Sequence, residues 1–221
     1  MLRPIFHDRA DAGRRLASEL SKYAGHDDLL VLGLPRGGVP VAHQVARALN
    51  APLDIFLVRK LGVPGHEELA MGAIASGGTV VLNQEVVRQI PGASRFIDGV
   101  KLRELRELER RERAYRGDRP HPDVRNQTVI LVDDGLATGA SMRAAAKALR
   151  AGRPARVVVA VPVAARAIRD SFWDVVDEVV CVSTPEPFYA VGLWYEDFSE
   201  TTDEEVRELL GSADVAPGPE T

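Results

Sequence analysis

The chain has 221 residues and a formal net charge of -4, from 28 basic and 32 acidic side chains. Hydrophobic residues make up 45% and charged residues 27%, a composition that excludes wholesale disorder and allows a sizeable core. The mildly acidic pI of about 5.8 disfavours strong non-specific binding to nucleic acid. Cys181 is the single cysteine, which excludes an internal disulfide and a cysteine-based metal cluster, so we expect a reducing, cytoplasmic location. Residues 1–15 lack the apolar stretch of a signal peptide, and the apolar run 157–165 is too short to cross a bilayer.

Hydrophobic periodicity predicts that strands and helices alternate along the chain. The expected helices are 8–24, 41–49, 95–116, 139–151, 164–172 and 202–210. The expected strands are 29–34, 54–60, 128–134, 157–163 and 178–183, with a β-hairpin formed by 69–76 and 79–83. This order predicts an α/β fold with a central, mainly parallel sheet flanked by helices. We expect one domain over 1–211 and a flexible tail over 212–221.

The expected helix 95–116 is densely charged, with many opposite charges three or four residues apart. Its arginines are 103, 106, 110, 111, 113 and 116. Its glutamates at 104, 107, 109 and 112 cancel much of that charge. A solvated helix is therefore favoured over a surface for nucleic acid.

Residues 129–141, VILVDDGLATGAS, carry the main functional signal. Four apolar residues predict a buried strand, Asp133 and Asp134 follow at its carboxyl end, and small residues then lead into a helix. Backbone N–H groups at that helix start can hold a phosphate, and a side chain at Gly139 would push the phosphate away. Two adjacent carboxylates would repel a phosphate but can accept hydrogen bonds from a vicinal diol. The motif therefore predicts a site for a ribose 5-phosphate.

This motif is similar to the phosphoribosyl diphosphate (PRPP) signature of type I phosphoribosyltransferases, and the resemblance extends over roughly residues 5–210. It implies a central parallel sheet, a Mg²⁺-dependent site for PRPP, a small hood over residues 185–200 that holds a nucleobase, and a homodimer. By position, Asp133 and Asp134 would face the ribose hydroxyls and serve Mg²⁺ indirectly. The 5-phosphate would be held by Ala137, Thr138, Gly139, Ala140 and Ser141.

A second loop, GLPRGGVP at residues 33–40, follows the first core strand. Arg36 offers a fixed positive fork, and Gly37 and Gly38 can expose N–H groups. The resemblance implies that this loop grips pyrophosphate and that the peptide bond between Pro35 and Arg36 is cis. An ordinary turn with a solvated arginine is the alternative.

Residues 59–68 resemble two further elements of the family. Arg59 and Lys60 resemble a basic pair that reaches pyrophosphate, sometimes from the partner subunit; a solvated strand end is the alternative. Residues 61–68 fall where the family carries a flexible lid, although a plain connecting loop fits equally well. The lid would draw its mobility and polarity from Gly62, Pro64, Gly65, His66, Glu67 and Glu68.

The segment 185–198 resembles the hood, and its aromatic residues are Phe188, Tyr189, Trp194, Tyr195 and Phe198. Phe188 and Trp194 are candidates to stack on the base, with core packing as the alternative for each. Glu196 or Asp197 could meet Mg²⁺ and pyrophosphate. The lysine that reads a purine carbonyl in many relatives is missing from VPVAARA, which offers only Arg166, so the acceptor stays open between purine-like bases and others.

The reaction that the resemblance implies is displacement at the anomeric carbon of PRPP. A base nitrogen attacks C1, pyrophosphate leaves, and Mg²⁺ and Arg36 neutralise the leaving group. Two alternatives use the same fold or site: a PRPP-sensing regulator that binds nucleic acid, and a hydrolase or phosphorylase acting on ribose phosphates.

Overall fold

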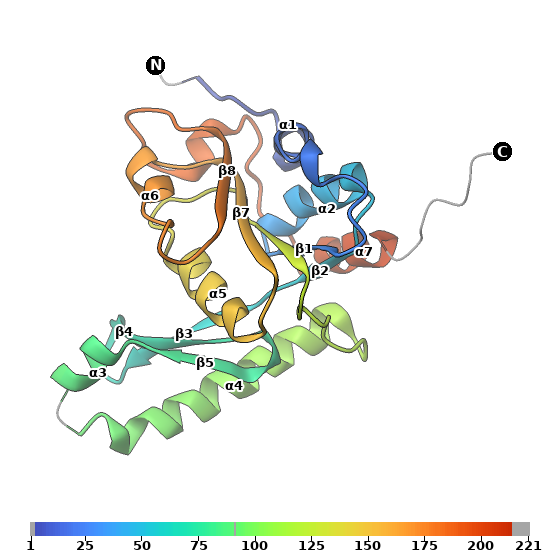
Figure 1. The fold of residues 1–221 in the computed structure, drawn as a ribbon. Coiled ribbons are helices and arrows are strands. Elements are labelled where there is room, and N and C mark those ends of the chain that lie inside the picture. The colour runs from blue at the N-terminus through green and yellow to red at the C-terminus, as the bar shows by residue number, and fades with distance from the viewer. Residues whose placement is uncertain (1–2, 91, 214–221) are drawn as a thin grey trace.

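The structure is a computed structural model that describes residues 3–90 and 92–213 (Figure 1). Of the expected flexible tail, residues 214–221 lie outside the described residues, whereas residues 212 and 213 belong to the last helix. Within the described part, no helix combines the length and the apolar character needed to cross a membrane.

A five-stranded parallel sheet forms the centre of the molecule, as the sequence predicts. Its strand order is β2-β1-β6-β7-β8, and every neighbouring pair is parallel. The strands are β1 (Leu29–Gly33), β2 (Leu53–Ile55), β6 (Thr128–Val132), β7 (Arg156–Val163) and β8 (Glu178–Ser183). All residues of β1 and β6 are buried, which explains why these segments are continuous apolar runs.

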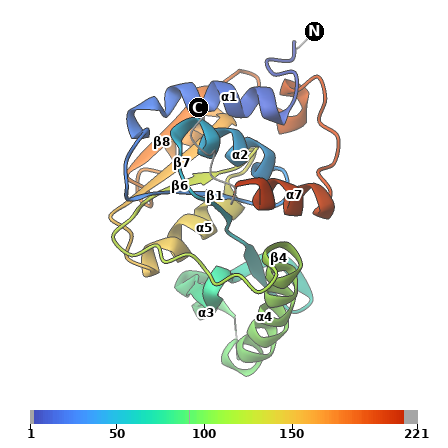
Figure 2. The same cartoon turned by 90° about the vertical axis from the view of Figure 1, so that its right-hand side faces the viewer.

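Helices cover both faces of this sheet (Figures 1 and 2). Helices α1 (Arg9–Glu19), α2 (Gly38–Leu49) and α7 (Asp203–Ala213) pack on one face with Val31 and Ile130. Helices α5 (Ala140–Ala151) and α6 (Arg166–Asp170) lie on the other, where α5 packs on Leu32 and Leu131. Consecutive residues of a strand thus pack into the cores on opposite faces of the sheet, because side chains alternate between the two faces.

A second, antiparallel sheet branches off after β2, and here two predictions were wrong. The expected strand 54–60 is two strands, because the chain leaves the main sheet after Ile55 and starts β3 (Val58–Val63). The expected loop 61–68 is a hairpin: β3 runs to Val63, Gly65 turns with a φ of 78°, and β4 (His66–Ala75) begins. The predicted hairpin with β5 (Thr79–Leu82) is confirmed.

The long helix α4 (Ser94–Arg116) is confirmed and packs against the second sheet and α7. Its side chains of Val100 and Leu108 are buried in the core that also holds α2. The remaining elements are α3 (Gln84–Gln89) and the short 3-10 turns η1 (Ser21–Tyr23), η2 (Ser76–Gly78) and η3 (Val191–Trp194).

Candidate functional site

The acid pair, Asp133 and Asp134, lies at the carboxyl end of β6 directly against the glycine loop of residues 33–40. A Cβ atom on Gly37 would come within 2.0 Å of Asp134 Oδ2, and one on Gly38 within 2.9 Å of Asp133 Cα. Only glycine lets the loop approach this closely. The peptide bond between Pro35 and Arg36 is cis, as the family resemblance implied.

This geometry corrects the expected role of Gly38. Its N–H group donates to the carbonyl of Leu34 at 3.0 Å, inside the turn that starts α2. The group is therefore used by the fold, and the glycine serves close packing against the acid pair.

The acid pair is tied into its surroundings on several sides. Asp133 Oδ1 accepts a hydrogen bond from the Asp134 N–H at 2.9 Å. Arg9 of α1 reaches Asp134 Oδ2 with Nε and Nη2, each at 3.0 Å. The Tyr195 hydroxyl donates to the Asp134 carbonyl at 2.6 Å. These contacts fix the backbone of Asp134 and one carboxyl oxygen of each acid.

Burial governs the electrostatics of the pair. It raises the pKa of Asp133 well above its usual range, and the neighbouring Asp134 carboxylate raises it further. Burial also raises the pKa of Asp134, while the charge and hydrogen bond of Arg9 oppose that shift. Two negative charges side by side are costly here, so the pair favours ligands that bring hydroxyl donors or a cation.

The cradle, residues 137–141, connects β6 to α5 beside the acid pair. Its residues Ala137, Thr138 and Ser141 are exposed, and so is Ala140. The loop ends at the N-terminus of the 12-residue helix α5, where backbone N–H groups and the helix dipole favour an anion, and the Ala140 N–H donates to Thr138 Oγ1 at 3.4 Å.

The structure gives Gly139 a reason that sequence analysis did not anticipate. Gly139 has a φ of 70°, and a Cβ atom there would lie 2.9 Å from Ile168 and 3.0 Å from Phe172. A side chain would therefore strain the backbone and collide with Ile168 and Phe172 whether or not a phosphate is bound.

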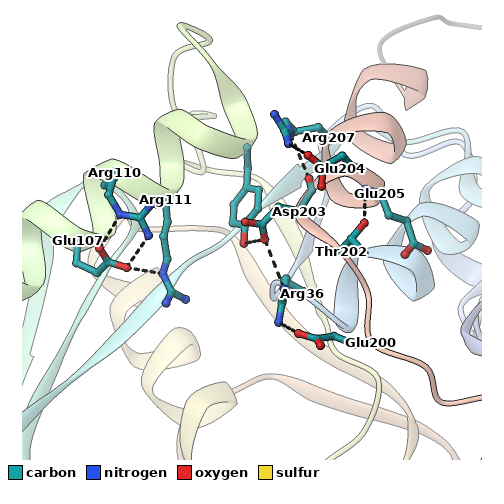
Figure 3. Close-up of polar contacts among 11 residues, drawn as sticks. Arg36, Glu107, Arg110, Arg111, Glu200, Thr202, Asp203, Glu204, Glu205 and Arg207 are labelled. Atoms are coloured by element: carbon teal, nitrogen blue, oxygen red, sulfur yellow. Dashed lines mark hydrogen bonds and ion pairs between the residues drawn. The ribbon is translucent and has the colours of Figure 1, made fainter.

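Both arginines expected to meet pyrophosphate are paired with carboxylates, and Figure 3 shows the pairing of Arg36. Arg36 pairs with Glu200 and lies 3.7 Å from Asp203, and Asp203 also accepts from the Tyr115 hydroxyl at 2.7 Å. Glu200 and Asp203 flank the start of α7, and Tyr115 belongs to α4.

The basic pair lies elsewhere than expected. Arg59 and Lys60 are inside β3 of the second sheet, because the chain has already left the main sheet at Ile55. Arg59 donates to Glu104 of α4 from Nε at 2.9 Å and from Nη2 at 2.6 Å. Arg36 therefore lies in the glycine loop beside the acid pair, whereas Arg59 lies in the second sheet.

The hood, residues 185–200, lies on the loop of the acid pair, since a Cβ atom on Gly135 would come within 2.6 Å of Val191. Trp194 is only 4% exposed and packs in a core cluster with Phe6. Its ring is stacked on Phe188 at a centroid distance of 6.2 Å. Trp194 thus follows the core-packing alternative, and Phe188 is the partly exposed ring of the two.

The other hood candidates also have defined places. Tyr195 is buried and holds Asp134, as described above. Glu196 Oε2 lies within hydrogen-bond distance of His7 Nδ1, at 2.8 Å, and Asp197 Oδ1 accepts from the Ser199 N–H at 2.9 Å. Asp197 is exposed, and no third metal-binding side chain joins it, since the described residues form no group of three or more suited to a metal.

Sequence analysis missed Arg9, Tyr115, Glu200 and Asp203 as neighbours of the site. Arg9 is 125 residues from Asp134 along the chain, and no spacing rule relates them. Glu200 and Asp203 precede or begin a helix that the sequence does predict, but their contact with Arg36 depends on how α7 docks.

A family model for the phosphoribosyl transferase domain matches residues 5–188. The chain belongs to the phosphoribosyltransferase family. The type I resemblance of the PRPP motif and the expected fold are thereby confirmed.

Individual relatives agree with this assignment. In two strains of Mycobacterium tuberculosis, proteins carrying the name "Putative phosphoribosyl transferase" are 46% identical over 209 residues, which is 95% of this chain and 47% of theirs. The chain thus spans about half the length of the curated relatives it matches. The bifunctional protein PyrR of Chloroflexus aurantiacus is 35% identical over 57% of this chain and 65% of its own. The crystal structure of TT1426 from Thermus thermophilus has a TM-score of 0.83 and 44% identity, covering 93% of this chain and 97% of that one.

Proposed function

We propose that this phosphoribosyltransferase-family chain binds PRPP together with Mg²⁺ and transfers the 5-phosphoribosyl group to a nucleobase-like acceptor, with release of pyrophosphate. The observation that carries the proposal is the meeting of three elements at one edge of the parallel sheet. These are the acid pair, the glycine loop pressed against it, and the cradle at the start of α5. This edge, at the carboxyl ends of the strands, is where open α/β sheets bind ligands.

Each element has a distinct task in the proposal. The cradle, residues 137–141, binds the 5-phosphate through backbone N–H groups and the Thr138 hydroxyl. Asp133 and Asp134 accept hydrogen bonds from the ribose hydroxyls. Arg36 binds the pyrophosphate group and stabilises its growing negative charge as the bond to C1 breaks. The protein positions and shields the reactants, and no protein nucleophile is required.

The acid pair also fits Mg²⁺. Mg²⁺ prefers oxygen ligands and usually takes one or two carboxylates in addition to substrate phosphates and water. Burial, above all, raises the pKa of both Asp133 and Asp134, so their charged forms are costly, and a cation arriving with PRPP would stabilise them. Bound there, Mg²⁺ would neutralise charge on the pyrophosphate. Asp197 is exposed and its Oδ1 already accepts the Ser199 N–H, so it is the weaker candidate.

The acceptor is proposed to be a planar heterocycle held under the hood. Phe188 remains the stacking candidate, whereas the buried ring of Trp194 supports it from the core side. Tyr189 is strongly exposed beside it. Arg166 pairs with Glu186 of the hood at 3.3 Å, so its charge is not available in full to read a base carbonyl.

The test is a panel of nucleobases incubated with PRPP and Mg²⁺ and scored for pyrophosphate release, with the nucleotide product identified by mass spectrometry. Pyrophosphate and nucleotide in equal amounts are the expected result with at least one base. Base-independent release of ribose 5-phosphate would favour the hydrolase. PRPP binding without turnover of any base would favour the regulator.

The regulator that binds nucleic acid finds little support in α4. Arg103 pairs with Glu104, Arg110 and Arg111 pair with Glu107, and Arg116 is buried against Asp54. Most of the positive charge is therefore compensated within the protein. A pulldown with RNA and DNA at several salt concentrations would test this alternative directly, because binding through phosphates weakens steeply with salt.

A further inference from the structure

We infer that Arg9 is a positioning residue for the ribose-binding acid pair, fixing Asp134 and tying the hood to it. The inference rests on the proposed function, because it assigns a task to a residue that acts through Asp134. It is carried by the contacts that Arg9 makes on its two sides.

On one side, Arg9 holds a single oxygen of Asp134. Both Nε and Nη2 lie 3.0 Å from Oδ2, and the glycine loop reaches the same oxygen: a Cβ atom on Gly37 would be 2.0 Å from Oδ2 and 3.2 Å from Arg9 Nε. Oδ2 is therefore occupied by a guanidinium group and crowded by the backbone of the glycine loop. This arrangement leaves Oδ1 as the oxygen that can accept a hydrogen bond from a ribose hydroxyl.

On the other side, Arg9 holds residues 196–200, the last part of the hood, which we call the strap because it leads to α7. Arg9 Nη1 donates to the Ser199 carbonyl at 2.7 Å, and the guanidinium group lies 4.0 Å from the centre of the Phe198 ring. The strap then continues to Glu200, the partner of Arg36. One side chain thus connects the acid pair to the segment that carries the hood toward the pyrophosphate arginine.

Arg9 differs from the other arginines of α1. Its side chain is 12% exposed and that of Asp134 15%, whereas Arg14 and Arg15 are 60% and 49% exposed and both face Asp11 on their own helix. A pair shielded from water is screened little, and loss of one partner leaves an uncompensated carboxylate. A planar guanidinium group can also serve Asp134, Ser199 and Phe198 at once, which a lysine ammonium cannot.

The experiment compares Arg9→Met with Arg15→Met, which removes the same charge and length from the same helix but outside the site. Calorimetry would measure the dissociation constants of PRPP, ribose 5-phosphate and pyrophosphate for each variant. We expect Arg9→Met to weaken PRPP and ribose 5-phosphate at least ten-fold and to weaken pyrophosphate binding by no more than about two-fold. Arg15→Met should match the wild type for all three ligands.

Two further variants separate positioning from folding. Arg9→Lys keeps the positive charge near Asp134 and should recover part of the lost ribose 5-phosphate affinity. In Asp134→Asn, the additional change Arg9→Met should cost much less affinity than it does in the wild type, because Arg9 acts through the carboxylate. The thermal unfolding midpoint of every variant would be measured alongside.

Equal weakening of all three ligands by Arg9→Met and Arg9→Lys would overturn the inference, because it would show a general structural role. Unchanged affinities in Arg9→Met, with PRPP still bound by the wild type, would overturn it as well. A wild-type protein that binds neither PRPP nor ribose 5-phosphate would instead refute the proposed function, and the inference with it.

Discussion

Release of Arg36 from its carboxylate partners should tighten the binding of pyrophosphate. Arg36 pairs with Glu200, and Asp203 lies 3.7 Å away (Figure 3). An anion that binds Arg36 must compete with these carboxylates. Glu200→Gln is the cleaner change, because Asp203 also accepts the Tyr115 hydroxyl and its loss would disturb α4.

The size of the effect follows from exposure. The side chains of Arg36 and Glu200 are 40% and 75% exposed, and exposed ion pairs contribute about 0.2–1 kcal/mol. Removing this competition should therefore lower the dissociation constant of pyrophosphate roughly 1.4- to 5-fold. The gain should shrink at high ionic strength, since salt screens an exposed pair.

The assay is calorimetric titration of pyrophosphate into wild type, Glu200→Gln and Glu204→Gln. Glu204 is a matched control: it lies on α7, pairs with Arg207 at 2.6 Å, and its substitution removes the same charge (Figure 3). Equally tighter pyrophosphate binding in both variants would show that the effect comes from net charge alone. Weaker binding in Glu200→Gln would refute the competition and assign Glu200 a part in holding Arg36 ready.

Three other changes have defined outcomes. Asp133→Asn should weaken PRPP binding about ten-fold or more while circular dichroism stays unchanged, since hydrogen bonds to a charged group contribute about 1.5–3 kcal/mol each; full affinity would refute the ribose assignment. Gly139→Val should lower the free energy of unfolding by about 2–4 kcal/mol, because of the positive φ and the contact with Phe172, and an unchanged denaturant midpoint would contradict this. The hydrogen bond to Glu196 raises the pKa of His7, so the stabilising contribution of this pair is present below pH 6.5 and is lost as pH rises through the raised pKa. NMR titration should show that the pKa of His7 falls in Glu196→Gln. An unchanged pKa would argue against the pair.

The central sheet could be predicted because its strands are buried on both faces. Segments such as Leu29–Gly33 and Thr128–Val132 are apolar throughout, and the chemical motifs follow them directly. The branch to the second sheet could not. Phe56 and Leu57 connect β2 to β3 and are themselves buried, so the apolar run 55–58 shows no break where the chain changes sheets.

The site could be predicted only in its local parts. The acid pair, the cradle and Arg36 belong to short motifs, and each lies at the expected edge of the sheet. Whether an aromatic residue faces a ligand or the core depends on residues that are distant in the sequence. The spacing of the hood residues therefore does not reveal that Trp194 is buried against Phe6. The same holds for Arg9, whose partner comes from another element.

Helix α4 shows most clearly what sequence analysis misses. Its charge pattern is typical of a solvated helix, yet Glu104, Tyr115 and Arg116 form a brace that attaches it to the rest of the fold. Glu104 is 8% exposed and binds Arg59 of β3, Tyr115 binds Asp203 of α7, and buried Arg116 contacts Asp54 Oδ1 of β2 at 3.1 Å. The inward-facing charges thus connect α4 to the second sheet, to α7 and to the main sheet.

The contribution of this brace should depend on pH. Burial raises the pKa of Glu104, but the hydrogen bonds and charges of Arg59 and Arg103 outweigh it, so that the pKa lies below 4.5. The carboxylate therefore stabilises the fold above pH 4.5, and this contribution is lost as pH falls through the lowered pKa. Glu104→Gln should cost about 1.5–3 kcal/mol of unfolding free energy at pH 7, and the gap to wild type should narrow as pH falls below 4.5. Glu109→Gln, exposed on the same helix, should show no gap at neutral or acid pH. Because glutamine cannot titrate, a gap for Glu104→Gln that persists unchanged in acid would mean that packing, and not the ion pair with Arg59, holds α4 against the second sheet.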